Sequence, residues 1–249
     1  MRDLLAETFR LLGAHLYLFT LISLTVWLPG HVVRNYLEFY GPPDESAAQS
    51  LGLVVLIQVI FDPLVVSGTL TVLGRVKQGL PVGYGTALTE GMAAWGRLFV
   101  VRLVINCAVA LPIFVGLAIR PSGPWGILAE GLLLGVAVLL VTLLVRYAVV
   151  DSVVVLEGGN AVTAWRRAAR LTAGRRGLVL RTAASLFIMI FGAAMLIGQA
   201  FRMAPDLNYF VPRVLVDCAL AVSQSVFTVA FFLIYWQARA AAAPVATVP

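Results

Sequence analysis

Charged residues are scarce in this sequence. Asp, Glu, Lys and Arg together make up 12% of the 249 residues, about half of the share that is usual in soluble domains. Hydrophobic residues make up 61%, and they gather in runs long enough to cross a bilayer. This balance excludes an ordinary soluble domain and predicts an integral membrane protein.

Histidine and cysteine are nearly absent. The two histidines, His15 and His31, lie near the first apolar run, and the two cysteines, Cys107 and Cys218, lie inside apolar runs. These are too few for a zinc cluster, and each cysteine is expected to be a small buried residue rather than half of a disulfide. The sequence also lacks the HExxH, GxSxG and phosphate-loop motifs. We therefore expect no metal and no cofactor.

The sequence carries a formal net charge of +6 and has a pI near 9.8, a balance that nucleic-acid-binding proteins share. Here, however, the basic residues stand at the ends of apolar runs, and no soluble module presents them as a patch. We therefore expect no nucleic-acid partner.

Six apolar runs predict an all-α, polytopic membrane protein. The expected transmembrane helices cover residues 14–33, 51–73, 97–119, 127–150, 178–201 and 214–236. They form a single transmembrane domain over residues 1–240, and the Ala- and Pro-rich residues 241–249 are expected to be disordered. Acidic residues interrupt the start of the sequence, so the first run is expected to be retained rather than cleaved as a signal peptide.

Three shorter stretches have the pattern of amphipathic helices that lie in a membrane interface. They cover residues 1–13, 84–95 and 160–173. In the third, Asn160 is placed to cap the start and Gly174 to follow the end, with Trp165 on one face and three arginines on the other. A charged face opposite an aromatic face is typical of interfacial helices.

The interfacial stretches suggest a threefold internal repeat. Each unit would contain a short helix, a span, an outer loop and a returning span, over residues 1–77, 78–158 and 159–240. The glycines Gly13, Gly96 and Gly174 mark corresponding junctions.

Basic residues predict the orientation in the membrane. Of the 18 Lys and Arg residues, Arg34, Arg120, Arg202 and Arg213 fall on one side, and the other fourteen fall on the opposite side or at helix ends near it. The positive-inside rule then places both termini in the cytoplasm. The densest group of arginines is expected to bind anionic lipid head groups, at about 1 kcal/mol for each residue. Its members are Arg166, Arg167, Arg170, Arg175 and Arg176.

Asp62 stands near the middle of the second predicted span and is followed by Pro63. A carboxylate at that depth costs roughly 3 kcal/mol on insertion scales. It is either an ion, proton or substrate site in a polar pocket with Gln58, or a structural acid paired with Arg102 or Arg146 across the bundle. Three further acids, Glu130, Asp151 and Asp217, lie nearer span ends and are expected to be hydrated or paired.

Residues 145–176 combine an Arg-Tyr span end, an apolar segment that ends in Glu-Gly, a short basic helix and a Gly-Arg-Arg junction before the next span. The residues of this pattern are Arg146, Tyr147, Glu157, Gly158, Ala164, Arg167, Leu171, Gly174 and Arg176. In this pattern the stretch resembles the YciC-like and glycerophosphodiester phosphodiesterase membrane-domain group of bacterial six-span proteins, although Ala168 stands where the group usually has Ser. The resemblance implies a protein of the bacterial inner membrane. It implies no reaction, because the phosphodiesterase chemistry of that group belongs to a separate soluble barrel.

Three hypotheses of function follow. The first is a non-catalytic integral protein of the bacterial cell membrane that organises the envelope or its lipids, or that serves as a membrane partner subunit. It would contact anionic lipids and a protein partner. The second is a small transporter or channel with a polar path around Asp62. The third is an enzyme that acts on lipid, which would need a cluster of polar residues at one interface.

Overall fold

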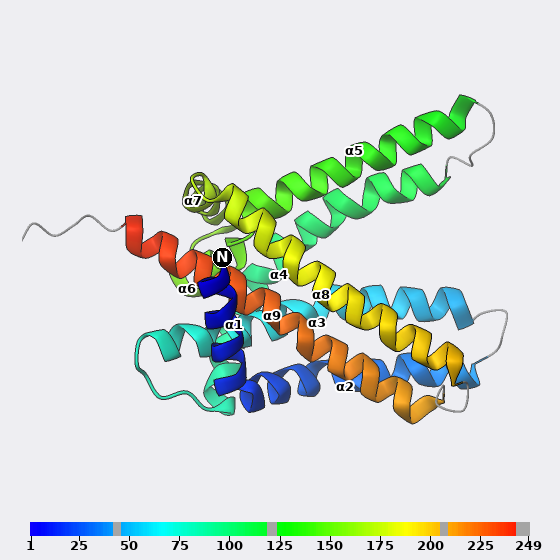
Figure 1. Ribbon diagram of the computed structural model, residues 1–249, viewed down its shortest axis with the longest axis horizontal. Coiled ribbons are helices and arrows are strands. Elements are labelled where there is room, and N and C mark those ends of the chain that lie inside the picture. Colours follow the sequence, from blue (N-terminus) through cyan, green and yellow to red (C-terminus); the bar gives the residue numbers. More distant parts are fainter. Residues whose placement is uncertain (42–45, 119–123, 205–208, 243–249) are drawn as a thin grey trace, which may run out of the picture.

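The computed structural model describes residues 1–41, 46–118, 124–204 and 209–242 (Figure 1). Within these ranges, the side chains of 46–55, 57–58, 109–118, 124–130 and 132–133 are not described. All the regular elements of the described residues are α-helices, as the sequence predicts. They are α1 (Arg2–Ala14), α2 (Leu16–Tyr40), α3 (Ser46–Lys77), α4 (Tyr84–Ala118), α5 (Pro124–Tyr147), α6 (Val150–Glu157), α7 (Ala161–Thr172), α8 (Arg176–Met203) and α9 (Phe210–Ala242).

Six helical segments are long and apolar enough to cross a membrane, which confirms the expected number. They are Leu16–Tyr40, Val59–Lys77, Tyr84–Ala108, Leu134–Glu157, Arg176–Met203 and Phe210–Ala242. Each has at least 18 residues, close to the roughly 20 that span a bilayer core of about 30 Å. Residues 241 and 242 were expected to belong to a disordered tail, but they are helical, since α9 continues through Ala242. The rest of the expected tail, residues 243–249, lies outside the described residues.

The structure corrects two of the expected elements. The predicted interfacial helix over residues 84–95 is not separate, because it forms the first turns of the 35-residue helix α4. Gly96 lowers helix propensity by about 1 kcal/mol, but Ala94 and Leu98 on either side of it are buried and hold the helix together. The fourth predicted span, residues 127–150, is likewise divided into α5 and α6 by a break at 148–149.

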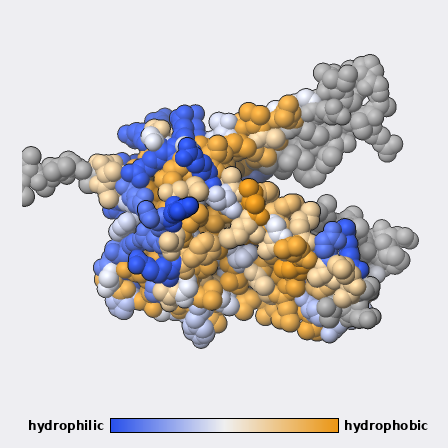
Figure 2. Space-filling model, in the orientation of Figure 1, coloured by the Kyte–Doolittle hydropathy of each residue, from blue (hydrophilic) through white to orange (hydrophobic). Residues whose placement is uncertain are grey.

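Consecutive long helices form three hairpins, α2–α3, α4–α5 and α8–α9 (Figure 1), and the hairpins pack together mainly through α3 against α4 and α2 against α9. The short helices α1, α6 and α7 lie at one end of the bundle, where the N-terminus and the end of α9 also lie (Figure 1). Hydrophilic residues gather at this same end, and hydrophobic residues cover the long helices beyond it (Figure 2). This layout has the three pairs that a repeat requires, although its second pair lacks a separate short helix, and the threefold repeat stays a prediction.

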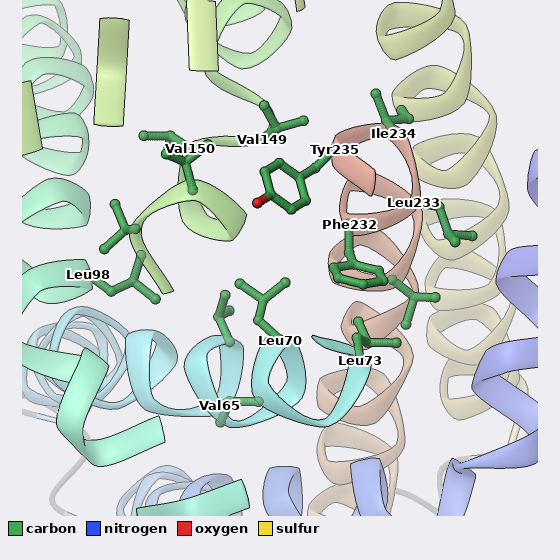
Figure 3. Packing of buried hydrophobic residues seen from close by; sticks show 14 of the residues in the cluster. Val65, Leu70, Leu73, Leu98, Val149, Val150, Phe232, Leu233, Ile234 and Tyr235 are labelled. Atoms are coloured by element: carbon green, nitrogen blue, oxygen red, sulfur yellow. The ribbon is translucent and has the colours of Figure 1, made fainter. Parts of the chain in front are cut away.

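The hydrophobic core is built around the second half of α9. Phe232, Leu233, Ile234 and Tyr235 are buried there. Phe232 and Tyr235 point toward Leu70 and Leu73 of α3 and the residues that open α6, whereas Leu233 and Ile234 project from the other side of α9 (Figure 3). The core therefore fixes α3, α6 and α9 together near the hydrophilic end.

The helices α3 and α4 approach most closely where two glycines meet. A Cβ atom added at Gly91 would lie 2.9 Å from the backbone nitrogen of Gly68 and 3.0 Å from its Cα. Only a residue without a side chain permits this distance, as in the small-residue contacts of transmembrane helices. The backbones of α3 and α4 therefore pack directly against each other.

The two cysteines are both free, as expected. Cys218 is buried, but Cys107 is exposed on α4, so the expectation that both are buried is wrong for Cys107. An apolar position in a spanning helix can face the bilayer as well as the core, and periodicity alone does not separate the two.

Candidate intramembrane binding site

Three charged side chains meet between the spanning helices. Arg102 of α4 donates from Nη1 to Oδ2 of Asp62 in α3, and from Nη2 to Oδ2 of Asp151 in α6 at 2.5 Å. We call Asp62, Arg102 and Asp151 the charge cluster. One guanidinium thus bridges two carboxylates that come from different helices.

The packing of α3 against α4 explains why Asp62 and Arg102 face each other. Asp62 precedes Gly68 by six residues in α3. Arg102 follows Gly91 by eleven residues, a distance of about 16 Å along α4. Because the two helices are antiparallel, both side chains lie on the same side of the glycine contact. The indole of Trp95 donates to the carbonyl oxygen of Ile60 at 2.8 Å and fastens α4 to this part of α3.

The break between α5 and α6 brings Asp151 to the cluster. Val149 leaves the helical conformation, with φ −103° and ψ 8°, and α6 begins at Val150. Asp151 stands in the first turn of α6, where the helix dipole favours a negative charge. Since α6 leaves the line of α5, its first turn can point toward α4.

The charge cluster is not electrically balanced. With both carboxylates ionised, two carboxylates and one guanidinium give the cluster one unmatched negative charge. In the part of the chain that the structure describes, neither carboxylate forms a second ion pair. The three side chains are 22% to 27% exposed. Taking ions out of water is costly unless the charges are matched.

Two cavities border the charge cluster. The first has a volume of about 550 Å³ and is lined by Asp62 and Arg102 together with polar residues of α4 and α9, namely Asn106, Gln224, Ser225 and Thr228. Ser225 is 4% exposed, and its hydroxyl has no hydrogen-bond partner among the described residues. This cavity can therefore receive a polar or charged group.

The second cavity has a volume of about 730 Å³. It has Arg102 and Asp151 in its wall, but most of its lining is aliphatic or aromatic and comes from α5, α8 and α9. The two cavities have five lining residues in common: Arg102, Asn106, Phe187, Phe227 and Thr228. The charge cluster therefore stands where the two cavities meet; both have largely apolar walls, and the first has more polar side chains in its wall than the second.

The structure brings together some of the predicted site residues and separates others. Asp62 pairs with Arg102, which is one of the two partners expected from the sequence. Arg146 is not part of the cluster; it is exposed, and its guanidinium lies 5.5 Å from the ring centroid of Tyr147. The side chain of Gln58 lies outside the described residues. Asp151 was expected to be hydrated or paired, but its place in the same site could not be foreseen.

The predicted lipid-binding arginines divide into two groups. Arg166, Arg170 and Arg176 are exposed. Arg167 is instead paired with Glu157, with 3.3 Å between Nε and Oε2, and Arg175 donates from Nη2 to the carbonyl oxygen of Gln237 at 3.4 Å. Only the first group presents guanidinium groups that these protein contacts do not occupy.

The α7 helix confirms its expected start. The side chain of Asn160 accepts a hydrogen bond from the backbone nitrogen of Thr163 at 2.9 Å. Its apolar face does not lie free, however, because Ala164, Ala168 and Leu171 are buried against the rest of the protein. That α7 lies in a membrane interface stays a prediction, and such contact would come from its arginine face.

Two other polar networks hold helices together away from the cavities. At the hydrophilic end, Tyr235 donates to Glu157 at 3.0 Å and accepts from Arg239 at 3.3 Å. Elsewhere, Asp217 accepts from Asn35 at 2.8 Å and pairs with Arg34. Asp217 is thus paired, as expected, and Glu157 ties α6 to α9.

Among the described residues, no group of three or more His, Cys, Asp or Glu side chains could hold a metal ion. Comparisons with protein-family models, with curated proteins and with solved structures find no match for this chain. The resemblance of residues 145–176 to the YciC-like group stays a prediction. Function must therefore be inferred from the site itself.

Proposed function

We propose that the protein is a small-molecule carrier of a bacterial cell membrane, and that the charge cluster binds a positively charged solute. The observation that carries the proposal is the placement of two carboxyl groups around a single guanidinium at the junction of two cavities between spanning helices. With both acids ionised, this leaves one negative charge for a cation to match. Ionisable residues inside a membrane are costly, and they commonly mark the path of an ion or a substrate.

The arrangement of donors favours a cation over an anion. Arg102 already donates from Nη1 and Nη2 to the two carboxylates, so an anion would have to displace one of them. A bound cation would instead bring the total charge of the cluster to zero. The hydroxyl group of Thr228 and the amides of Asn106 and Gln224 belong to residues that line the same cavity and carry further oxygen atoms.

A purely structural ion pair is the competing explanation of the cluster. Such a pair would tie α3, α4 and α6 together and would need no space beside it. The cavity of about 550 Å³ that includes both Asp62 and Arg102 in its wall favours a binding role.

Transport can be tested with purified protein in liposomes. The probe is tetramethylammonium, a compact cation that does not cross the bilayer unaided, and the readout is the current on a solid-supported membrane after a concentration jump. We expect a saturable current that falls at least tenfold in Asp62→Asn and in Asp151→Asn. Glu90→Gln is the matched control, since Glu90 is paired with Arg75 outside the cavities and its variant should keep the current.

Two outcomes would count against transport. One is the absence of a protein-dependent current from the wild-type protein. The other is an unchanged current in Asp62→Asn, which would leave the cluster with a structural role only.

A second candidate function is the organisation of anionic lipid. It is favoured by the exposed guanidinium groups of Arg166, Arg170 and Arg176, which stand on α7 and at the start of α8. A cluster of this kind next to a spanning helix is typical of head-group binding.

The test is mass spectrometry of the lipids and proteins that co-purify in native-lipid particles. Changing Arg166, Arg170 and Arg176 to Gln should deplete anionic lipid, whereas Arg202→Gln, an exposed arginine at the end of α8, should not. An unchanged lipid profile in the triple variant would refute lipid binding by these residues. A protein recovered in stoichiometric amount would indicate a partner subunit instead.

A further inference from the structure

The larger cavity is unsuited to a small hydrated cation alone. Along α5 it runs from Leu140 to Tyr147 and along α8 from Leu180 to Phe187, about 10 Å of each helix. Its walls there are mostly hydrocarbon. A hydrated ion gains nothing from such walls, whereas an alkyl chain is as well accommodated there as in lipid.

The same cavity opens toward the lipid-facing side of the protein. Several of its lining residues are also on the molecular surface: Val141 is 49% exposed, Leu180 45% and Phe187 59%. These residues belong to α5 and α8, and the arm formed by α4 and α5 diverges from α8 (Figure 1), with an opening in the surface beside the arm (Figure 2). A molecule dissolved in the bilayer could therefore enter between α5 and α8.

The charged residues at one end of the cavity determine which head group a ligand can have. The apolar walls lead to Arg102 and Asp151, and beyond them to the first cavity, which has Asp62 and several polar side chains in its wall. Charged groups are costly in apolar surroundings unless they are matched. A ligand with a cationic head would therefore stabilise the carboxylates at this end of the cavity.

We infer that the ligand is a membrane-resident amphiphile, with a cationic head group at the charge cluster and a hydrocarbon chain along α5 and α8. This inference rests on the proposed function for its binding site, and it specifies the substrate class. The chemistry is that of an alkylammonium: one positive charge for the unmatched carboxylate and a chain for the apolar walls. Entry is from the bilayer between α5 and α8.

The test is photolabelling of the full-length protein in lipid nanodiscs. The probe is dodecyltrimethylammonium with a diazirine on its chain, and the readouts are the mass of the intact protein and the mapping of labelled peptides. We expect one probe per protein, attached within α5, α8 or α9. Excess dodecyltrimethylammonium without the diazirine should abolish the label.

Two comparisons test the head group and the chain separately. The same chain carrying a hydroxyl or a sulfate in place of the ammonium should label at least tenfold less. Asp62→Asn and Asp151→Asn should reduce labelling by the cationic probe at least tenfold, while Glu90→Gln should leave it unchanged. Retained circular dichroism and a monodisperse elution profile show that a variant is folded.

The outcomes separate this inference from the proposed function. Equal labelling by all head groups would overturn the inference, because the cavity would then be a general lipid crevice. A tetramethylammonium current with no labelling would also overturn it and leave a carrier of soluble cations. Cation-specific labelling without any current would support the inference and refute transport. The absence of both would refute both.

Discussion

At the residue scale, Arg102 is the side chain that holds the charge cluster together. It is the link between Asp62 of α3 and Asp151 of α6, two helices that the chain order does not place side by side. The three residues act as one unit in stability, because the free energy lost on removing any one of them depends on the charges that remain on the other two.

Removal of Arg102 should therefore destabilise the protein more than removal of one acid. Arg102→Gln leaves two carboxylates near each other without a cation and should cost about 3–5 kcal/mol. Asp62→Asn leaves the pair of Arg102 and Asp151 and should cost about 1–2 kcal/mol. The measurement is unfolding in mixed micelles at increasing SDS concentration. Equal stability of the two variants would show that the site does not hold two ionised carboxylates.

Tyr235 gives a second prediction, at the hydrophilic end. Its ring is fully buried, and its hydroxyl connects Glu157 with Arg239. Tyr235→Phe keeps the ring but leaves these groups without the hydroxyl, so a loss of about 1–2 kcal/mol is expected in the same unfolding assay. Tyr36→Phe is the control, because Tyr36 is exposed. A loss of the same size in both variants would refute the role of the hydroxyl.

The sequence predicts the first half of the charge cluster and not the second. An aspartate in the middle of an apolar run is conspicuous, and Arg102 is one of the few cations at a similar depth. Asp151 carries no such signal, because the run that precedes it gives no sign of the break at 148–149. The position of α6 depends on long-range packing against α3 and α9, which local patterns do not encode.

At the scale of elements, the pair of α3 and α4 is the rigid part of the molecule. The glycine contact brings the two backbones together, and Trp95 and the charge cluster add polar links further along. By contrast, α8 is the least buried of the six candidate spans, with 6% of its apolar window buried. Motion near the apolar cavity is therefore expected at α8 rather than at α3 or α4.

Two glycines of the same helix should respond in opposite ways to alanine. Gly91→Ala forces a Cβ against the backbone of Gly68 and should cost about 1–3 kcal/mol. At Gly96 no atom lies within 4 Å of the added Cβ, so Gly96→Ala should stabilise the helix by about 0.5–1 kcal/mol. Unfolding in SDS separates the two. A stabilising Gly91→Ala would mean that the helices do not pack as closely as described.

Sequence patterns succeed where a helix is determined locally. The start of α7 is an example, since the Asn160 cap and the spacing of buried residues are both within one short segment. They fail at α4, because the low helix propensity around Gly96 is outweighed by the burial of Ala94 and Leu98. The role of Gly91 cannot be predicted from the sequence either, because the close approach of the two backbones also requires Gly68 in another helix.

At the scale of the whole molecule, the described N-terminus and the end of α9 share the hydrophilic end (Figures 1 and 2). Three ion pairs fasten this end: Lys77 with Glu7 at 2.6 Å, Arg167 with Glu157 at 3.3 Å, and Arg75 with Glu90. Most of the Lys and Arg residues are predicted to lie on the side of the membrane where this end lies. The positive-inside rule therefore predicts that the hydrophilic end faces the cytoplasm.

This orientation predicts the accessibility of single cysteines in whole cells. With Cys107 and Cys218 changed to Ser, Arg202→Cys should react with an impermeant maleimide in intact bacteria. Ala240→Cys should react only after permeabilisation. Both positions are exposed and each stands near the C-terminal end of its helix, but α8 and α9 are consecutive and antiparallel, so the two positions lie at opposite ends of the bundle. The reverse pattern would invert the topology, and labelling of both in intact cells would contradict a spanning bundle.

The unmatched charge of the cluster has a consequence for a carrier in an energised membrane. A transmembrane potential does work of about 2.3 kcal/mol per elementary charge for each 100 mV. The empty site carries one negative charge, whereas the site loaded with a monovalent cation is neutral, so the electric field acts only on the empty form. Where the cell interior is negative, the field draws the empty site toward the outer face. The potential would then drive uptake by returning the empty carrier, not by pulling on its cargo.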